Sequence, residues 1–482
     1  MNKYQNRSRN HLRKTPTGIQ GLDEILEGGL PHGRSTLVCG SAGTGKTLMA
    51  VEFLVKGAKF YDEPGVFISF EETLEELTEN TASLNIDLMK LIDEDKIFVD
   101  YVYVERSEIE ETGVYDLEGL FLRLEDAIQR TGAKRVVLDT LETLFSGFTD
   151  TGILRAELRR LFRYLKDKDL TAVITAERGD GQLTRQGMEE YISDCVIVLD
   201  NRIKEGLSTR RLRIVKYRGS SHGNDEYPFL INNFGFWILP ITSIGLDYTA
   251  STKRISTGIS ELDDMLAGGG YYRGSNILVS GSAGTGKTSV VAHFVDAACT
   301  RGMCCLIFAH EESNNQIIRN MRSIGINLEP WIQQGLLKIQ SERVTKQGME
   351  SHLLKSHQMV DSFHPEVLVI DPVSDFTSIG TSDDVKSMLI RMIDSYKALG
   401  ITTLFTHLTS GGEHEQSTEI GISSLIDTWI LLRYLETDGE RNRSLYVLKS
   451  RGMGHSNQLR HFQITDNGIQ LQSTLNARGD LQ

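Results

Sequence analysis

An eight-residue loop with the sequence GSAGTGKT occurs twice, at Gly40–Thr47 and at Gly281–Thr288. It matches the pattern G-x-x-x-x-G-K-[ST], in which backbone N–H groups cradle the β- and γ-phosphates of a nucleotide at the positive end of a helix. Because each loop lies between a predicted strand and a predicted helix, we interpret both as ATP sites. In each loop the lysine would contact the phosphates and the threonine would ligate Mg²⁺; these residues are Lys46 and Thr47, and Lys287 and Thr288.

Carboxylates follow predicted strands in both halves of the chain. Asp139 and Asp371 each end a short apolar run, which is the Walker B position, where a carboxylate holds the Mg²⁺ shell at the carboxyl edge of a parallel sheet. Two adjacent glutamates, Glu71–Glu72 and Glu311–Glu312, also follow apolar runs. One carboxylate of such a pair can polarise a water or a hydroxyl group. A turn aspartate and a solvated helix cap are the alternative interpretations.

A third motif combines an apolar strand face with two cations. Side chains at alternate positions of a strand share one face, and in each half such a face ends in a lysine and an arginine. In ring ATPases, cations of this kind reach the γ-phosphate held by a neighbouring subunit, as an arginine finger does; a pair of surface cations is the alternative. The two faces are Leu212, Ile214, Lys216 and Arg218, and Leu445, Val447, Lys449 and Arg451.

These motifs are parts of a duplicated sequence. The glycine loop recurs 241 residues further along the chain, the glutamate pair 240 residues and the Walker B aspartate 232 residues further along. The order is kept and the offset changes once, so we predict two copies of one domain, with an extra loop in the first copy at Arg106–Asp116. The expected boundaries are a flexible tail at 1–14, a first domain at 15–245, a second domain at 246–470 and a short tail at 471–482.

The elements that must position the motifs can be placed coarsely. Apolar runs bounded by glycine and polar turns predict strands, and the stretches between them predict helices such as Leu117–Arg130 and Leu154–Lys166. This alternation predicts an α/β fold of two tandem RecA-like P-loop domains, each with a mostly parallel sheet flanked by helices. The end of each domain, for example Arg210–Tyr217, predicts antiparallel strands instead. The other predicted strands of the first half are Ser35–Cys39, Gly65–Phe70, Arg135–Asp139, Thr171–Thr175 and Asp194–Leu199.

Size and composition argue against several classes of protein. The chain has 482 residues, too many for one core, and a formal net charge of −13, which is unfavourable for general nucleic-acid binding. No apolar run reaches the ~18 residues of a membrane span, and the polar, basic stretch 1–14 does not resemble a secretory signal. The five cysteines match neither a disulfide framework nor a zinc site. We therefore expect a cytoplasmic protein with no membrane or nucleic-acid partner.

The duplicated GSAGTGKT loop, the glutamate pairs and a repeated K-x-R-G-x-x-H motif resemble the KaiC family of circadian-clock ATPases and autokinases, from about Thr15 to Ile469. The resemblance implies a homohexamer of two stacked rings with ATP and Mg²⁺ bound between subunits. It implies that the first ring is a slow ATPase. The second ring would be a serine/threonine kinase that phosphorylates, and dephosphorylates, neighbouring subunits of the same protein.

The resemblance also implies particular site residues. The family's catalytic carboxylates match Glu71, Glu72, Glu311 and Glu312. The implied metal contacts are Thr47 in the first half, and Thr288 and Glu311 in the second half. In the first half the implied ATP contacts are Gly43, Thr44, Gly45, Lys46, Thr47, Leu48, Ser83, Lys216, Tyr217, Arg218, Ser220 and His222. In the second half they are Gly284, Thr285, Gly286, Lys287, Thr288, Ser323, Arg443, Lys449, Ser450, Arg451 and His455.

The residues that the family phosphorylates match Ser423 and Ser424. At the equivalent positions the first half has Glu190 and Tyr191. Only the second half therefore offers a pair of hydroxyl groups, which suits a kinase half joined to a plain ATPase half. Two serines without a chemical role are the alternative.

The sequence departs from the clock protein at several places. Ser424 stands where the clock protein has threonine, and His310 stands before the second glutamate pair where it has tyrosine. Because only thirteen residues follow Ile469, a KaiA-like partner is not favoured. A KaiB-like partner stays open, since Arg106–Asp116 lies where the family binds KaiB. A timer-like or stress-signalling role is as consistent with these features as a circadian one.

Two other functions share the predicted fold. A RecA-like recombinase or helicase would act on DNA, but the sequence shows no aromatic and basic stripe of the kind that binds single strands. An ATP-gated scaffold would switch a partner protein without phosphorylating itself. Incubation with labelled ATP separates the three: label on the protein, hydrolysis stimulated by DNA, or neither.

Overall fold

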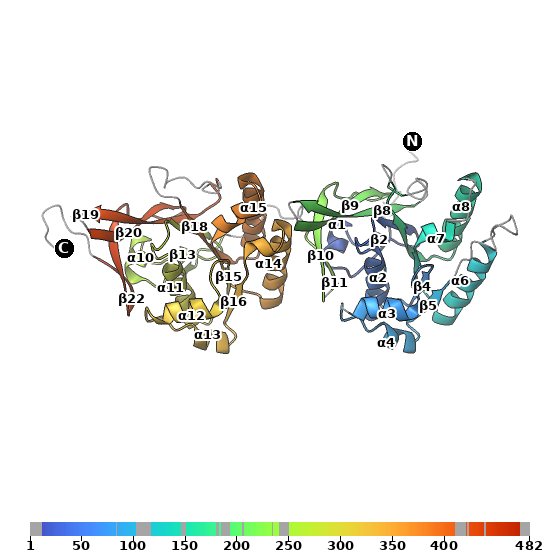
Figure 1. Ribbon diagram of the computed structural model, residues 1–482, viewed down its shortest axis with the longest axis horizontal. Helices are drawn as coiled ribbons and strands as arrows, with labels where there is room; N and C mark the ends of the chain where they lie inside the picture. Colours follow the sequence, from blue (N-terminus) through green and yellow to red (C-terminus); the bar gives the residue numbers. More distant parts are fainter. Residues whose placement is uncertain are drawn as a thin grey trace, which may run out of the picture. The chain divides into compact units, whose positions relative to one another are not determined.

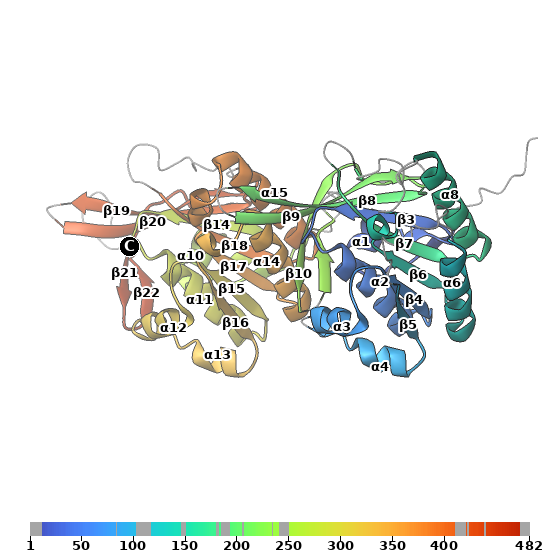
Figure 2. The same ribbon diagram turned by 45° about the vertical axis from the view of Figure 1, so that its right-hand side comes forward.

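The computed structural model describes the chain as two compact units, Met1–Thr242 and Ser243–Gln482. Each unit is a large sheet with helices on its faces (Figures 1 and 2). The extra loop predicted at Arg106–Asp116 lies outside the described residues. The described residues are 12–82, 84–102, 117–145, 151–179, 183–184, 193–204, 207–233, 235–240, 250–409, 421, 424–437 and 440–472.

The first unit is built on a nine-stranded sheet in the order β5-β4-β6-β7-β3-β8-β9-β10-β11. The strands from β5 to β8 run parallel, and β9 to β11 continue the sheet antiparallel. The strands are β3 (Ser35–Gly40), β4 (Gly65–Ser69), β5 (Ile97–Tyr101), β6 (Arg135–Asp139), β7 (Thr171–Glu177), β8 (Cys195–Lys204), β9 (Leu207–Tyr217), β10 (Glu226–Asn232) and β11 (Gly235–Ile238), beside a small ladder of β1 (Lys14–Thr15) and β2 (Leu30–Pro31).

Helices cover both faces of this sheet, which is why its central strands are apolar on both sides. Val38 of β3 packs in a core cluster with α2, whereas the adjacent Leu37 packs in a second cluster with α6 and α8. Successive side chains of a strand point to opposite faces, so the two clusters lie on the two sides of the sheet. The helices are α1 (Leu22–Ile25), α2 (Lys46–Phe60), α3 (Leu74–Ala82), α4 (Leu88–Asp93), α6 (Glu118–Thr131), α7 (Leu141–Phe145) and α8 (Thr151–Asp167).

The second unit repeats this topology in the order β16-β15-β17-β18-β14-β19-β20-β21-β22. Its strands are β14 (Asn276–Gly281), β15 (Cys305–Ala309), β16 (Leu337–Ser341), β17 (Val367–Asp371), β18 (Thr402–Leu408), β19 (Thr428–Thr437), β20 (Glu440–Ser450), β21 (Arg460–Thr465) and β22 (Gly468–Leu471), beside β12 (Arg254–Ile255) and β13 (Tyr271–Tyr272). Its helices are α10 (Ser260–Met265), α11 (Lys287–Thr300), α12 (Asn314–Arg322), α13 (Glu329–Gln333), α14 (Met349–Phe363) and α15 (Ser382–Ala398), with 3₁₀ turns η1 (Val344–Lys346) and η2 (Val373–Ser378).

The predicted fold class, two tandem RecA-like α/β units, is confirmed. The differences from prediction are at element ends. The predicted strand Thr171–Thr175 continues to Glu177 as β7, and the predicted helix Leu154–Lys166 begins earlier, at Thr151. Asp194 precedes β8 rather than opening it.

Candidate functional site

The first P-loop connects β3 to α2 and requires glycine at two positions. Gly43 and Gly45 have φ values of +74° and +100°, which residues with a Cβ rarely adopt. A Cβ on Gly45 would also lie 2.6 Å from Ile231 Cδ1. Helix α2 begins at Lys46, so the unpaired N–H groups of its first turn point into the loop. The loop of the second half repeats this arrangement, with φ values of +76° and +101° at its two glycines.

The P-loop lysines fold back over their own loops. Lys46 Nζ donates to Gly40 O at 2.9 Å and to Ser41 O at 3.1 Å. Lys287 Nζ donates to the two equivalent carbonyls at 2.8 and 3.0 Å. In the second half, burial lowers the pKa of Lys287, and nearby carboxylates oppose this shift. Both ammonium groups therefore lie against the loop whose amides would hold the phosphates.

The threonine after each lysine bonds to the Walker B aspartate. Thr47 Oγ1 donates to Asp139 Oδ2 at 2.9 Å, and Thr288 Oγ1 donates to Asp371 Oδ2 at 3.0 Å. The other oxygen of each aspartate accepts from a threonine in the strand beside the P-loop strand. Sequence reasoning missed these two threonines, each of which is the fifth residue of its strand; they are Thr175 in β7 and Thr406 in β18.

The glutamate pair of the first half lies at the same edge of the sheet. Glu71 accepts from Thr140 Oγ1 at 2.9 Å and from Thr143 Oγ1 at 2.6 Å, just after the Walker B strand. Glu72 accepts from Asn80 Nδ2 at 3.3 Å, and its Oε2 is buried without a hydrogen-bond partner. A buried carboxylate oxygen of this kind suits a bound cation or water.

Burial changes the acidity of these carboxylates. Asp139 is only 3% exposed, and desolvation raises its pKa to about 6 despite the hydrogen bonds that it accepts. In the second half desolvation also raises the pKa of Glu311 and of Glu312, and the neighbouring Asp371 contributes to both shifts. Carboxylates that repel one another in this way fit a divalent cation, which would supply the missing positive charge. The P-loop amides, lysines, threonines and aspartates together therefore fit a nucleotide with Mg²⁺.

Lys216 and Lys449, the predicted cations of the antiparallel strands, lie at the amino ends of the parallel strands. The P-loop of each half lies at the opposite, carboxyl ends. Strand β3 enters the P-loop at its carboxyl end, Gly40. Lys216 of β9 pairs with Val196, the second residue of β8, beside the amino end of β3. Lys449 of β20 pairs with Trp429, the second residue of β19, beside the amino end of β14. Arg218 and Arg451, the predicted arginine fingers, follow these lysines by two residues. Within each half, the predicted P-loop contacts are therefore separated from the predicted cation contacts.

An open pocket occurs at this amino edge in both halves. Its volume is about 450 Å³ in the first unit and about 560 Å³ in the second. Three equivalent lining positions carry the same residue type in the two pockets: a lysine near the end of the helix before β7 or β18, the aspartate before β8 or β19, and the predicted arginine finger. They are Lys166, Asp194 and Arg218 in the first unit, and Lys397, Asp427 and Arg451 in the second.

Arg451, which lines the second pocket, also contacts the segment that contains the predicted phosphoacceptors. Arg451 Nη2 donates to Ser424 O at 2.7 Å, and Ser424 itself is exposed. Lys397 Nζ forms an ion pair with Asp427 at 2.9 Å. The structure therefore brings one predicted acceptor beside a predicted finger arginine, while Ser423 lies outside the described residues.

Several predicted ATP contacts have side chains that point into the protein. Tyr217 is 5% exposed and its hydroxyl donates to Gly29 O at 2.7 Å. Ser450 is buried and its Oγ lies 3.1 Å from Thr428 Oγ1. These residues could meet a ligand only through their backbone. Thr44 and Thr285 donate to carbonyls inside their own P-loops. Leu48 is half-buried in α2. The remaining contacts lie in the loops after β9 and β20; they are Ser220, His222 and His455.

Arg443 lies away from the other predicted contacts of its strand. Its Nε donates to Gly284 O of its own P-loop at 3.2 Å, beside Tyr434, whose hydroxyl donates to the same carbonyl at 2.6 Å. Tyr434 was not predicted from the sequence, because its place over the loop depends on the β19–β20 pairing. Ser323 is exposed at the end of α12, and Ser83 lies outside the described residues.

Two sheets of this topology, each with a P-loop at the carboxyl end of its central strand, define a tandem RecA-like P-loop ATPase. Comparison with known proteins then gives the family. A family model described as "ATPase: KaiC" matches residues 15–243 and 255–476. The chain belongs to the KaiC ATPase family, and this membership implies that it binds nucleotide.

Curated relatives agree with this assignment. The chain is 55% identical over 462 residues to "Circadian clock protein KaiC2" of a Synechocystis species, covering 95% of this chain and 81% of that protein. It is 41% identical over 468 residues to "Circadian clock oscillator protein KaiC" of Parathermosynechococcus lividus, covering 96% and 86%, and 39% identical over 461 residues to the protein of that name from Synechococcus elongatus, covering 95% and 88%. None of the helices in the described part of the chain combines the length and apolar character that crossing a membrane requires.

Proposed function

We propose that the chain is a homohexameric ATPase and serine autokinase and autophosphatase of the KaiC type, with ATP and Mg²⁺ bound between subunits. The first half would hydrolyse ATP. The second half would phosphorylate Ser423 and Ser424 of a neighbouring subunit. Family membership supports the ATPase activity, and the geometry of the two sheet edges supports the arrangement between subunits.

The observation that carries the proposal is the separation of the P-loop from the finger cations. Thr428 and Leu432 of β19 pair with Ile277 and Gly281 of β14. Four residues of strand span about 13 Å, so Lys449, beside the start of β19, cannot contact a phosphate held at the far end of β14. A head-to-tail contact between two copies would place one subunit's amino edge against the P-loop edge of the next. Repeated by rotation, such a contact closes into a ring.

The chemistry of the amino edge fits a phosphate-bearing partner surface. Guanidinium groups bind phosphate oxygens through two donors at once, and lysines add point charges. The first pocket is lined by five cations and two aspartates: Arg34, Arg159, Arg163, Lys166 and Arg218, with Asp167 and Asp194. This excess of positive charge is expected of a surface that receives a neighbour's nucleotide.

In the second half the chain's own groups suit transfer to a hydroxyl group. Glu311 would accept the hydroxyl proton, and its raised pKa brings a carboxylate closer to the range of an efficient general base. Lys449 and Arg451 of a neighbouring subunit would offset the charge that develops during transfer. Bound Mg–ATP supplies the phosphoryl group, and Thr288 with Asp371 would hold its metal ion.

The biological setting is part of the proposal. Because the relatives are named as circadian clock proteins, we place the enzyme in circadian, timer-like or stress signalling. The five cysteines are free thiols, which fits a reducing cytoplasm. A KaiB-like protein at the first domain is the proposed partner, and a KaiA-like one is not favoured.

Assembly tests this proposal directly. With a slowly hydrolysed ATP analogue, the wild-type chain should sediment as a hexamer, whereas a chain carrying Arg218→Ala and Arg451→Ala should assemble weakly. Arg213→Ala is the matched control, since Arg213 is an exposed cation of β9, the strand that precedes Arg218, and lies outside the pocket. A wild-type chain that stays monomeric at every nucleotide concentration would refute the proposed hexamer. A hexamer that takes up no label from ATP would favour the ATP-gated scaffold.

A further inference from the structure

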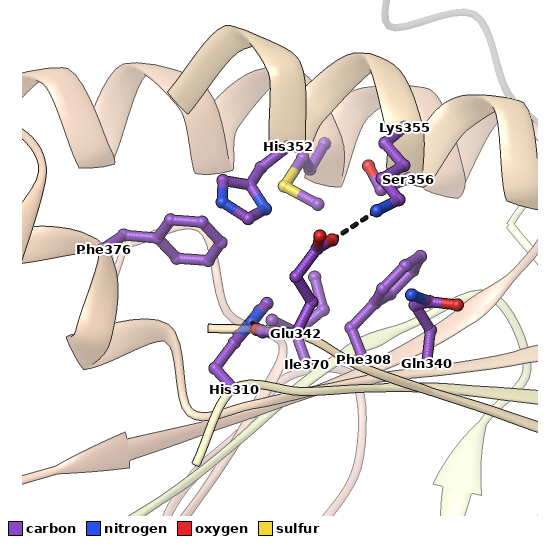
Figure 3. Close-up of a pocket in the computed structure, with 10 residues that line it drawn as sticks. Phe308, His310, Gln340, Glu342, His352, Lys355, Ser356, Ile370 and Phe376 are labelled. Atoms are coloured by element: carbon purple, nitrogen blue, oxygen red, sulfur yellow. Dashed lines mark hydrogen bonds and ion pairs between the residues drawn. The ribbon is translucent and has the colours of Figure 1, made fainter. Parts of the chain in front are cut away.

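A cluster of polar side chains fills a place in the second half where the first half is apolar. The cluster surrounds a small cavity of about 20 Å³ between the sheet and α14 (Figure 3), which is room for about one water. At the equivalent place the first half packs apolar residues of one core cluster and its border. The polar residues that replace apolar ones are His310, Glu342, His352 and Ser356, at positions equivalent to Phe70, Val102, Leu120 and Leu124. Gln340 and Lys355 also line the cavity, and their equivalents Asp100 and Arg123 form an ion pair in the first half.

The two histidines and the glutamate of the cluster each have a defined contact. His310 Nδ1 lies 2.9 Å from Glu342 O, and His352 Nε2 lies 2.9 Å from Val344 O. A carbonyl oxygen only accepts, so the ring nitrogens donate. The Glu342 carboxylate forms an ion pair with Lys355 of α14. Buried polar groups are costly unless bonded, and these bonds offset that cost.

The bond from His310 adds to a backbone arrangement that both halves share. His310 N donates to Asp371 O at 2.9 Å, as Phe70 N donates to Asp139 O at 2.8 Å. The neighbouring strand end is tied in the same way, since Glu342 N donates to Ala309 O at 3.0 Å. Phenylalanine has no donor in its side chain, so the additional tie from the end of β15 to the end of β16 belongs to the second half.

Aromatic contacts fix the plane of the His310 ring. The ring packs edge-on against Phe376 of η2, with centroids 5.0 Å apart, and against His352, with centroids 5.9 Å apart. Phe376 follows the Walker B strand, and Figure 3 shows the three rings facing one another across the cavity. The residue directly before the glutamate pair is thereby held to the segment that follows the Walker B aspartate.

We propose that His310 is a positioning residue of the second half, which fixes the Glu311–Glu312 pair at the edge of the sheet by tying the end of β15 to the end of β16 through its bond to Glu342 O. The proposal rests on the proposed kinase function of this half. Transfer to a serine needs the acceptor, the base and the phosphate in one alignment, and small displacements are costly. Nδ1 carries a hydrogen in the neutral donor tautomer and in imidazolium alike, so the tie does not depend on the charge of the ring.

Three variants of the full-length protein test this role. His310→Phe copies the first half and removes the donor, so the rate constant of autophosphorylation should fall on the order of tenfold with the KM for ATP unchanged. His310→Asn keeps an N–H donor and should restore most of the rate. His352→Leu also copies the first half but leaves the tie from His310, and should stay within about twofold of wild type. A normal rate for His310→Phe, or a His310→Asn variant as slow as His310→Phe, would overturn the role.

A second readout separates this inference from the proposed function. If the wild-type protein takes up no phosphate, the autokinase proposal fails, and ATP hydrolysis by the second half remains measurable in a Glu71→Gln, Glu72→Gln background. There His310→Phe should lower the hydrolysis rate about threefold, since a water molecule adapts to a displaced carboxylate better than a tethered serine does. An unchanged hydrolysis rate would refute the positioning role by itself.

Discussion

Transfer between subunits predicts a specific result when two inactive variants are mixed. One variant carries Ser423→Ala and Ser424→Ala and lacks the acceptors, and the other carries Glu311→Gln and Glu312→Gln and lacks the candidate base. Ser424 precedes β19, at the amino edge of the sheet, and the P-loop follows Gly281 at the other edge, about 13 Å further along β14 even from the start of β19. In-line transfer needs about 3–3.5 Å between the reacting atoms.

The structure therefore sets the expected magnitude. In hexamers assembled from equal amounts of both variants, half of the subunits offer acceptors and half offer an intact base. A productive interface needs one of each in a fixed order, so about one quarter of the interfaces should be active. Each variant alone should incorporate no label from ATP.

The assay is incorporation of labelled phosphate after subunit exchange, with the phosphorylated peptide identified by mass spectrometry. Label should appear on the subunits with wild-type serines, at about a quarter of the wild-type rate. Exchange is verified with a size tag on one variant. Mixed hexamers that stay unlabelled would refute transfer between subunits, and label on the serine variant would show that the acceptor lies elsewhere.

Two further predictions concern the separate halves. Glu71→Gln with Glu72→Gln should slow ATP hydrolysis by the first half ~10²–10⁴-fold, which removes most of the steady-state hydrolysis, and should leave autophosphorylation measurable; normal hydrolysis would mean that the first half is assigned wrongly. Burial lowers the pKa of both His352 and His357 of α14 to about 4 from 6.5. The unfolded chain then binds more protons between these pH values, so the second unit should lose stability as the pH falls through this window, by about 2 kcal/mol for each histidine at pH 5. His352→Leu should remove about half of that loss in urea unfolding followed by the fluorescence of Trp331 and Trp429, and an unchanged loss in the variant would exclude His352 as a source.

Local motifs allowed the fold class to be predicted from the sequence. The P-loop is one continuous stretch of sequence, so its glycines, its lysine and the following helix can be recognised without knowing any distant contact. The motif also occurs twice, which makes a chance match less credible. Thr175 and Thr406 were out of reach, because their contact with the Walker B aspartates depends on the order of strands that are far apart in the chain. The same holds for Tyr434, which reaches Gly284 O across the β19–β20 hairpin.

The shared strand face predicted for Leu212, Ile214 and the two cations is wrong, because alternation along β9 is interrupted. Leu212 and Ile214 pack in the core cluster with α2, but the pairing with β8 shifts by one residue before Lys216, which lies opposite Val196 of the other core cluster. Lys216 therefore faces away from these apolar side chains, and Tyr217 packs beside them instead. The predicted roles of the glutamates, cations and serines stay predictions, since they concern ligands and neighbouring subunits. No pattern in one chain specifies the distance between two copies of it.

The hydrogen bond between Arg451 and Ser424 joins a side chain to a main-chain oxygen. Every residue type has a main-chain carbonyl oxygen, so this hydrogen bond does not depend on which side chain stands at position 424. Threonine, aspartate or glutamate could replace Ser424 without loss of the hydrogen bond itself. The residue type at position 424 can therefore change while Arg451 still holds the turn that precedes β19.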